Sequence, residues 1–284
     1  MNVLVTGSNG QLALTIKALF DENKKGINFI FKSKTELDIT SSGNIHEFFD
    51  NNTLDYCINC AAFTNVELAE TKKEEAFTIN SDAVKNLALA CKKQGIVLIH
   101  ISTDYVFDGE SCKPYKETDP TNPINVYGSS KLEGERHIMA NLEQYFIIRA
   151  SWLYSVFGHN FFKTVVKKIN NNETMSVVNS QLGTPTSCED LARFIFFLIY
   201  SQSRDYGLYH FAPNGETSWF GFASYIASHY KSDLIQPVGS FKTQARRPQY
   251  SVLDNSKVKA IGANIRNWQI AVDDVVIKYK EGLS

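Results

Sequence analysis

The segment Val3-Leu4-Val5-Thr6-Gly7-Ser8-Asn9-Gly10-Gln11-Leu12-Ala13 opens the chain and decides the fold that we expect. A short apolar run rich in β-branched residues leads directly into two glycines, and a helical pattern then continues to Phe20. A strand, a glycine-rich turn and a helix in this order let a pyrophosphate approach the backbone N–H groups at the helix start. Gly7 and Gly10 permit the tight turn, and Ala13 stands where a third glycine is common. We therefore predict a dinucleotide phosphate site in this segment.

The chain that follows alternates apolar strand patterns with helical patterns, which predicts an α/β fold around a parallel sheet. Expected strands cover residues 28–31, 55–59, 97–101 and 145–151, and expected helices cover 42–51, 74–94 and a segment beginning at Tyr127. Beyond residue 151 the alternation loosens: helices are expected near 160–169, from 187, near 219–230 and at the end of the chain, and short strands near 175–178 and 207–211. No linker separates the two parts, so we expect a first domain at 1–150 interleaved with a smaller one at 151–284.

Composition restricts the class of protein. The 284 residues are 43% hydrophobic and 21% charged with a formal net charge of -1, values typical of a soluble enzyme. No basic stripe is present to bind phosphates of nucleic acid, so no nucleic-acid partner is expected. No signal peptide or membrane span is indicated, and five scattered cysteines suggest free thiols in a reducing compartment. We expect a cytoplasmic protein without a membrane partner, and we assign no metal site.

Two motifs are interpreted as structural. Cys57 and Cys60 have the spacing of a redox pair, but they lie in a strand pattern, where positions three apart point to opposite faces. His100 is the one polar residue in the apolar run 97–101, and it is expected to be packed in the core rather than catalytic.

Residues at the expected strand ends indicate where the cofactor lies. The second strand ends in Lys32-Ser33-Lys34 and lacks the acidic residue that binds the ribose of NAD, which favours NADPH, although two lysines also suit a solvated loop. Asp38 is equally compatible with binding the adenine amino group and with a turn. Ala61 and Ala62 follow the third strand, and small residues there let a cofactor lie flat at the carboxyl edge of the sheet.

Tyr127 and Lys131 are the strongest candidates for chemistry. Four residues separate them, so on a helix they project from one face. A nearby Lys cation favours the phenolate over a phenol whose ordinary pKa is about 10, which we expect to bring the Tyr127 proton into the working range. The hydroxyl of Thr103, at the end of the fourth expected strand, is placed to share a carbonyl oxygen with the phenol. All these segments should meet at one edge of one sheet.

The sequence resembles the extended short-chain dehydrogenase/reductase superfamily, and more narrowly the dTDP-4-dehydrorhamnose reductase family. The resemblance runs nearly end to end and departs from the family pattern at Ala13, Cys60, Phe63 and 179–180. It is carried by residues 7–12, 102–109, 127–135, 149–154, 183–186 and 247–254.

The resemblance implies a Rossmann-type doubly wound sheet, NADPH (with NADH possible) as cofactor, and reduction of the C4 ketone of a nucleotide-linked 6-deoxy sugar. It implies that Thr103, Tyr127 and Lys131 are catalytic. The cofactor would be bound by Gly7, Gly10, Gln11, Leu12, Asp38, Ile39, Ala61, Ala62, Phe63, Tyr127 and Lys131, and the substrate by Thr103, Asp104, Trp152 and Arg247.

Several alternatives stay open. Arg247 suits the substrate pyrophosphate but is equally compatible with an exposed loop. The reaction of another nucleotide-sugar enzyme, such as a sibling 4-ketoreductase, an epimerase or a dehydratase, is the first alternative function. The second is a dinucleotide-binding regulatory subunit without turnover. A homodimer is expected because dimers are the commonest soluble oligomers, and a magnesium requirement stays open.

Overall fold

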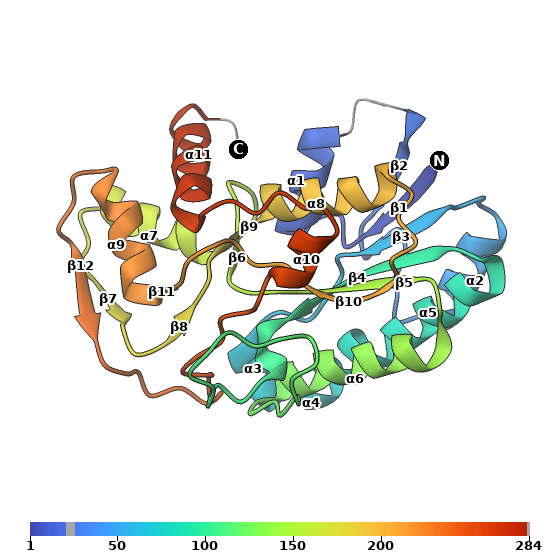
Figure 1. Cartoon of the computed structure of the whole chain (residues 1–284), viewed down its shortest axis with the longest axis horizontal. Coiled ribbons are helices and arrows are strands. Elements are labelled where there is room, and N and C mark those ends of the chain that lie inside the picture. The colour runs from blue at the N-terminus through green and yellow to red at the C-terminus, as the bar shows by residue number, and fades with distance from the viewer. Residues whose placement is uncertain (21–25, 283–284) are drawn as a thin grey trace.

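The core of the protein is a parallel sheet of six strands, shown in a computed structural model that describes residues 1–20 and 26–282 (Figure 1). The strand order is β10-β5-β4-β3-β1-β2, and every neighbouring pair is parallel. The order runs outward in two directions from the centre, as in a doubly wound sheet, so this part of the expected fold is confirmed. The strands are β1 (Asn2–Thr6), β2 (Asn28–Lys32), β3 (Tyr56–Asn59), β4 (Val97–Thr103), β5 (Tyr145–Ala150) and β10 (Gly207–His210).

Helices cover both faces of this sheet because its strands are apolar on both faces. Val3 and Val5 belong to a core with α1 (Gln11–Phe20) and α8 (Cys188–Tyr200). Leu4 points the other way, into a core that includes α2 (Ser42–Asp50). That second layer also contains α5 (Ala83–Gln94) and α6 (Val126–Asn141).

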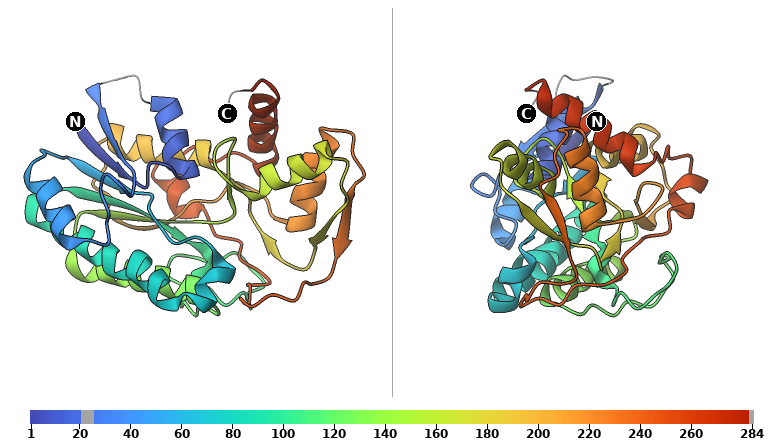
Figure 2. Two further views of the ribbon diagram at one scale, coloured as in Figure 1. Left: turned by 180° about the vertical axis from the view of Figure 1, so that it is seen from behind. Right: turned by 90° about the vertical axis from the view of Figure 1, so that its left-hand side faces the viewer.

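The second half of the chain builds a smaller lobe beside the sheet (Figures 1 and 2). Its own core joins three helices to the parallel pair of β7 and β12. Two more short strand pairs, β6 with β9 and β8 with β11, lie toward the large sheet. Its elements are β6 (Leu153–Tyr154), α7 (Phe161–Asn170), β7 (Met175–Val178), β8 (Leu182–Gly183), β9 (Thr186–Ser187), β11 (Thr217–Ser218), α9 (Trp219–Ser228), β12 (Ile235–Val238) and α11 (Trp268–Lys280). The helix α10 (Ser256–Ala260) also comes from the second half, but its Val258 packs in the core of the large sheet.

The two halves are interleaved. β10 pairs with β5 at the edge of the large sheet, and α8 packs on the face that α1 covers. The expected division into interleaved domains at residue 150 stays a prediction. Because β10 and α8 belong to the large sheet and its core, the smaller lobe is attached to the sheet by elements that lie between its own segments in the sequence.

One expected helix differs from the structure. The pattern at 74–94 forms α4 (Lys73–Phe77), a π-helical turn η2 (Thr78–Asp82) and then α5, and a further helix, α3 (Val66–Thr71), precedes them. Asn80 lies in the π-helical turn and is buried. Its amide binds the backbone N and O of Phe63 and the hydroxyl of Ser130. These distant contacts stabilise a turn that local periodicity does not reveal.

The structural interpretation of the cysteines is confirmed. All five are free thiols, and Cys57 and Cys60 pack toward opposite faces of the sheet. Within residues 1–20 and 26–282, no helix is long and apolar enough to cross a membrane, and no group of three His, Cys, Asp or Glu side chains is placed to hold a metal ion.

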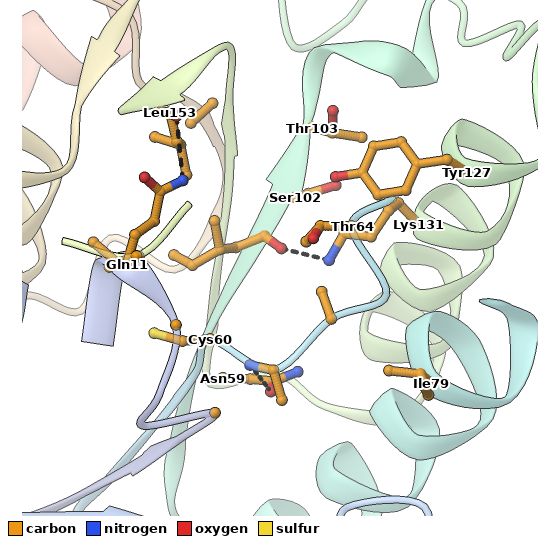
Figure 3. A pocket seen from close by; sticks show the side chains of 18 of the residues that line it. Gln11, Asn59, Cys60, Thr64, Ile79, Ser102, Thr103, Tyr127, Lys131 and Leu153 are labelled. Atoms are coloured by element: carbon orange, nitrogen blue, oxygen red, sulfur yellow. Dashed lines mark hydrogen bonds between the residues drawn. The ribbon is translucent and has the colours of Figure 1, made fainter. Parts of the chain in front are cut away.

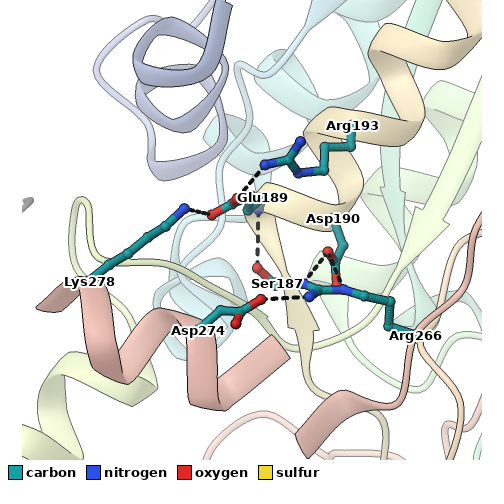
Figure 4. Close-up of polar contacts among 7 residues, drawn as sticks. All are labelled: Ser187, Glu189, Asp190, Arg193, Arg266, Asp274 and Lys278. Carbon is teal, nitrogen blue, oxygen red and sulfur yellow. Dashed lines mark hydrogen bonds and ion pairs between the residues drawn. The ribbon is translucent and has the colours of Figure 1, made fainter. Parts of the chain in front are cut away.

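An ion-pair cluster fastens α8 to the C-terminal segment (Figure 4). The Arg266 guanidinium reaches Asp190 at 2.6 Å and Asp274 at 2.5 Å. Glu189, one residue before Asp190, accepts hydrogen bonds from Arg193 and Lys278. Burial raises the pKa of Asp190 even though Arg266 lies against it, so the carboxylate depends on its partner.

We expect Arg266→Met to lower the free energy of unfolding by about 2 kcal/mol, because Asp190 loses a charge-assisted hydrogen bond in a site that water enters poorly. Arg193→Met is the matched control: its side chain is 59% exposed, and the change should stay within about 0.5 kcal/mol. Urea unfolding measures both. Equal losses in the two variants would contradict this account of the cluster.

Candidate active site

A cavity of about 710 Å³ lies at the carboxyl edge of the sheet, between the sheet and the smaller lobe (Figure 3). Most of the residues predicted to bind cofactor or substrate line it together. From that set the wall includes Gly7, Gly10, Gln11, Leu12, Asp38, Ile39, Ala61, Ala62, Thr103, Asp104, Tyr127, Lys131, Trp152 and Arg247. The expected convergence of strand ends is thus what the structure shows.

The glycine turn forms the floor of this cavity and packs tightly against the chain that follows β3. Gly7 has a φ of +66°, and a Cβ there would lie 2.7 Å from the backbone nitrogen of Ala61. The N–H of Gly10 donates to the Gly7 carbonyl at 2.9 Å, after which α1 begins with free N–H groups in its first turn. Gln11 donates its Nε2 to the Leu153 carbonyl, while its buried Oε1 has no hydrogen-bond partner among the described residues. The turn therefore offers an anion cradle and an unsatisfied acceptor.

The loop after β2 shows which of its cations faces the cavity. Lys34 lines the wall. Lys32 is directed instead toward Glu36, at 3.9 Å, and Ser33 donates both its N–H and its hydroxyl to the same carboxylate. Glu36 thus engages two of the three residues expected to receive a 2′-phosphate, which the sequence pattern did not reveal.

Asp38 is a turn residue that also lies at the cavity wall, and its contact with adenine stays a prediction. It lines the cavity, and its Oδ1 accepts from the N–H and hydroxyl of Thr40 at 2.9 and 2.8 Å. These bonds lower the pKa of Asp38, with the Thr40 backbone N–H as the largest cause. The lowered pKa keeps the Asp38 carboxylate ionised at neutral pH, and the residue lies in a turn at the cavity wall.

The segment after β3 lies along the cavity except at Phe63. Ala61, Ala62 and Thr64 line the cavity, whereas Phe63 does not. The Phe63 ring packs with Ala69 and Ala76, so the structure separates it from the other predicted cofactor residues. Adjacent residues of an extended chain point to opposite sides, and this rule favours Thr64 once Phe63 is buried.

Helix α6 places the phenol and the ammonium. Asn125 caps its start by accepting from the Gly128 N–H at 2.7 Å. A Cβ at Gly128 would lie 2.1 Å from the Tyr105 carbonyl, so the first turn of α6 touches the chain just after β4. This contact brings Tyr127 beside Thr103, whose hydroxyl bonds the phenol.

Burial controls the acidity of this group of side chains. It raises the pKa of Tyr127 to about 12, partly offset by the bond to Thr103, and it raises the pKa of Asp104 to about 6. The expectation that Lys131 lowers the phenol pKa does not hold in this structure, because desolvation dominates. Tyr127 therefore keeps its proton at neutral pH.

Lys131 is buried with its ammonium nitrogen against β4. Its Nζ donates to the Ile101 carbonyl at 2.6 Å and lies 3.2 Å from Nε2 of His100. Burial lowers the pKa of Lys131 to about 8 despite the nearby charge of Glu135. Glu135 is itself buried and bonded to Arg149 at 2.6 and 2.9 Å, so its charge is compensated.

The opposite wall is aromatic. Trp152 has a φ of +49° and stacks on Trp219 with ring centroids 3.7 Å apart. Gly183 supports the stack, since a Cβ there would lie 2.6 Å from the Trp152 ring. Arg247 closes the wall and pairs with Glu67 at 2.6 Å, so it is neither exposed nor free of partners.

Several lining residues were missed by sequence reasoning. Asn9 and Thr64 lie inside segments that the motifs identified, and alternation along the chain could have singled out Thr64. Gly158, His159 and Trp219 come from loops and a helix start of the smaller lobe, for which no local signal exists.

Comparison with known proteins agrees with this geometry. The family model described as "RmlD substrate binding domain" matches residues 1–281. A dTDP-4-dehydrorhamnose reductase of Sinorhizobium fredii is 36% identical in an alignment 282 positions long that covers 95% of this chain and 94% of the relative. The chain belongs to the dTDP-4-dehydrorhamnose reductase family.

Solved structures of this family superpose closely. A dTDP-4-dehydrorhamnose reductase of Clostridium acetobutylicum has a TM-score of 0.94 at 37% identity and covers 99% of this chain and 100% of its own. The enzyme of Bacillus anthracis, solved in complex with NADP, has a TM-score of 0.93 at 35% identity and covers 98% of this chain and 99% of its own.

We expect Gly128→Ala to lower the free energy of unfolding by about 2 to 3 kcal/mol, because α6 must move away from the rigid carbonyl of Tyr105. Gly239→Ala is the control, since nothing lies within 4 Å of its added Cβ. Thermal unfolding at matched conditions compares the two. Loss of stability in the control alone would contradict the close packing described for α6.

Proposed function

We propose that this protein reduces the C4 ketone of dTDP-4-dehydrorhamnose to the alcohol of dTDP-L-rhamnose, with NADPH as the reductant. The observation that carries the proposal is the juxtaposition of Thr103, protonated Tyr127 and buried Lys131 on one wall of a cavity whose floor is a glycine turn. Family membership supports the same activity.

The residues present fit a dinucleotide. Gly7 and Gly10 leave the backbone open to a pyrophosphate at the start of α1. Asp38 suits the adenine amino group, and Lys34 suits a 2′-phosphate. NADPH bound there supplies hydride to the C4 carbon.

The side chains of the protein would control the oxygen of the ketone. As negative charge grows on that oxygen, Thr103 donates a hydrogen bond and Tyr127 donates its proton. Because burial keeps the Tyr127 phenol protonated, transfer waits until the oxygen has become a stronger base. Lys131 contributes positive charge beside the site in its ammonium form.

The smaller lobe would hold the nucleotide sugar. The stacked rings of Trp152 and Trp219 offer a flat apolar face to a sugar, and Asp104 offers an acceptor for a hydroxyl. Arg247 suits the pyrophosphate, because a guanidinium pairs bidentately with phosphate oxygens. Its Glu67 partner holds the guanidinium at the cavity wall.

We further propose a cytoplasmic homodimer. The free thiols suit a reducing compartment, and dimers are the most frequent soluble oligomers. Light scattering after size-exclusion chromatography measures the mass directly.

Tyr127→Phe should lower turnover by roughly 100- to 10,000-fold, because the proton donor is lost while the ring remains. NADPH oxidation with dTDP-4-keto-L-rhamnose generated in place measures the rate, and fluorescence titration shows that NADPH still binds. Tyr154→Phe is the matched control, since Tyr154 does not line the cavity and its hydroxyl has no hydrogen-bond partner among the described residues.

The outcomes separate the competing functions. Turnover with another 4-keto sugar, and none with this one, would identify a sibling ketoreductase. Tight NADPH binding without any turnover in the wild type would favour a regulatory subunit.

Lys34→Ala should weaken NADPH binding about tenfold while leaving NADH binding unchanged, because only the 2′-phosphate needs the cation. Lys32→Ala is the matched control: its ammonium is directed toward Glu36 and the Phe48 ring. Calorimetric titration with both cofactors measures the two variants. A loss confined to Lys32→Ala would reverse the assignment.

A further inference from the structure

A buried chain of polar groups leads from the sheet interior to Lys131. Asn59, at the end of β3, places its Nδ2 3.1 Å from Nδ1 of His100 on β4. The Nε2 of the same imidazole lies 3.2 Å from Lys131 Nζ. Asn59 and His100 are almost fully buried, and the mechanism described above does not use them.

The backbone of Ala61 determines which way the Asn59 amide is turned. Its N–H lies 3.2 Å from Asn59 Oδ1, and an N–H can only donate. The Thr6 hydroxyl donates to the same oxygen at 2.7 Å. Rotating the amide by half a turn would set its NH₂ group against the Ala61 N–H, so the oxygen must stay where it is.

The tautomer of His100 follows from that orientation. Because the Asn59 NH₂ group donates to Nδ1, that ring nitrogen must be the bare acceptor. Burial lowers the pKa of His100 far below its ordinary value, so the ring is neutral. Its single N–H is therefore on Nε2, directed at Lys131 Nζ.

A nitrogen that receives this N–H must offer a lone pair, which an ammonium does not have. We propose that Asn59 and His100 are positioning residues that stabilise the amine form of Lys131. The proposal rests on the function proposed above. Lys131 in its amine form fits all its contacts: one N–H donates to the Ile101 carbonyl, the lone pair accepts from His100, and one N–H is left for a ligand.

The other charged and titratable groups around Lys131 act in the opposite direction. Glu135 on α6 and Cys60 after β3 both favour the ammonium, although Glu135 is bonded to Arg149 of β5. Tyr127, one turn earlier on α6, is neutral. The balance leaves Lys131 able to exist in both forms near neutral pH, as its lowered pKa indicates.

This balance has a use in the proposed reaction. Each reduction leaves Tyr127 without its proton. An ammonium on Lys131 that transfers one proton to the phenolate restores the phenol and becomes the amine that His100 stabilises. A proton from bulk solvent then returns to the amine, so each turnover consumes one solvent proton together with one hydride from NADPH, and the step balances.

The first experiment needs no substrate. Long-range ¹H–¹⁵N correlation spectra of the wild type, with His100 assigned from His100→Gln, report which ring nitrogen carries the proton. We expect a neutral ring protonated on Nε2. A proton on Nδ1, or a charged imidazolium at neutral pH, would overturn the proposal whether or not the protein is a reductase.

Asn59→Asp tests the cause. A carboxylate accepts from Nδ1, so the tautomer should invert and Nε2 should become an acceptor for the Lys131 ammonium. The pKa of Lys131, followed by ¹³C NMR of labelled lysine, should rise by roughly one pH unit or more. Thr6→Val is the matched control: it removes a hydroxyl from Asn59 Oδ1 but leaves the Ala61 N–H, so tautomer and pKa should stay the same.

Activity then gives an independent result. If Lys131 returns the proton, the alkaline limb of the rate profile should move upward in Asn59→Asp together with the NMR pKa, and stay in place in Thr6→Val. A tautomer that inverts while the Lys131 titration stays unchanged would show that His100 has only a structural role. A wild type without turnover would count against the proposed function alone, because the NMR outcomes stand without it.

Discussion

The absence of a side chain at Gly128 is the constraint on which the site depends. The Tyr105 carbonyl occupies the space where a Cβ would be, so the first turn of α6 rests directly on the chain that leaves β4. Thr103 belongs to that strand, and Tyr127 belongs to that turn. A helix one side chain further away would separate the two hydroxyls that must act on one oxygen. The Asn125 cap and the buried amide of Asn80, which binds Ser130 of the same helix, keep α6 in this position.

Much of this arrangement is predictable from sequence because its rules are local or geometric. The glycine turn identifies the first crossover, a four-residue spacing puts Tyr127 and Lys131 on one helix face, and parallel strands deliver their carboxyl ends to one edge. Contacts between distant segments are less accessible. The π-helical turn depends on Asn80 reaching Phe63 and Ser130, and the place of Trp219 depends on a two-strand pairing between β8 and β11.

Electrostatic properties were the least predictable from residue types. A Tyr and a Lys four residues apart suggest a phenol made more acidic by its neighbour. In the structure both are buried, and desolvation pushes both toward their neutral forms. The phenol pKa is raised where the sequence predicted that it would be lowered. A neutral phenol can still donate a proton to a ketone, so the proposed chemistry is unchanged. Spacing identifies the partners, whereas burial determines their charges.

The edge strand β10 has a consequence for how such proteins can be recombined. Because residues 207–210 complete the sheet and α8 covers one of its faces, a fragment ending at residue 150 would expose the side of β5 and uncover an apolar face. Arg149 would also lose its contact with His210. An exchange of the smaller lobe between relatives therefore cannot be made at a single crossover point. Functional chimaeras would have to retain at least two separate pieces of the second half with the first, so new specificities are more accessible through point changes in the cavity wall.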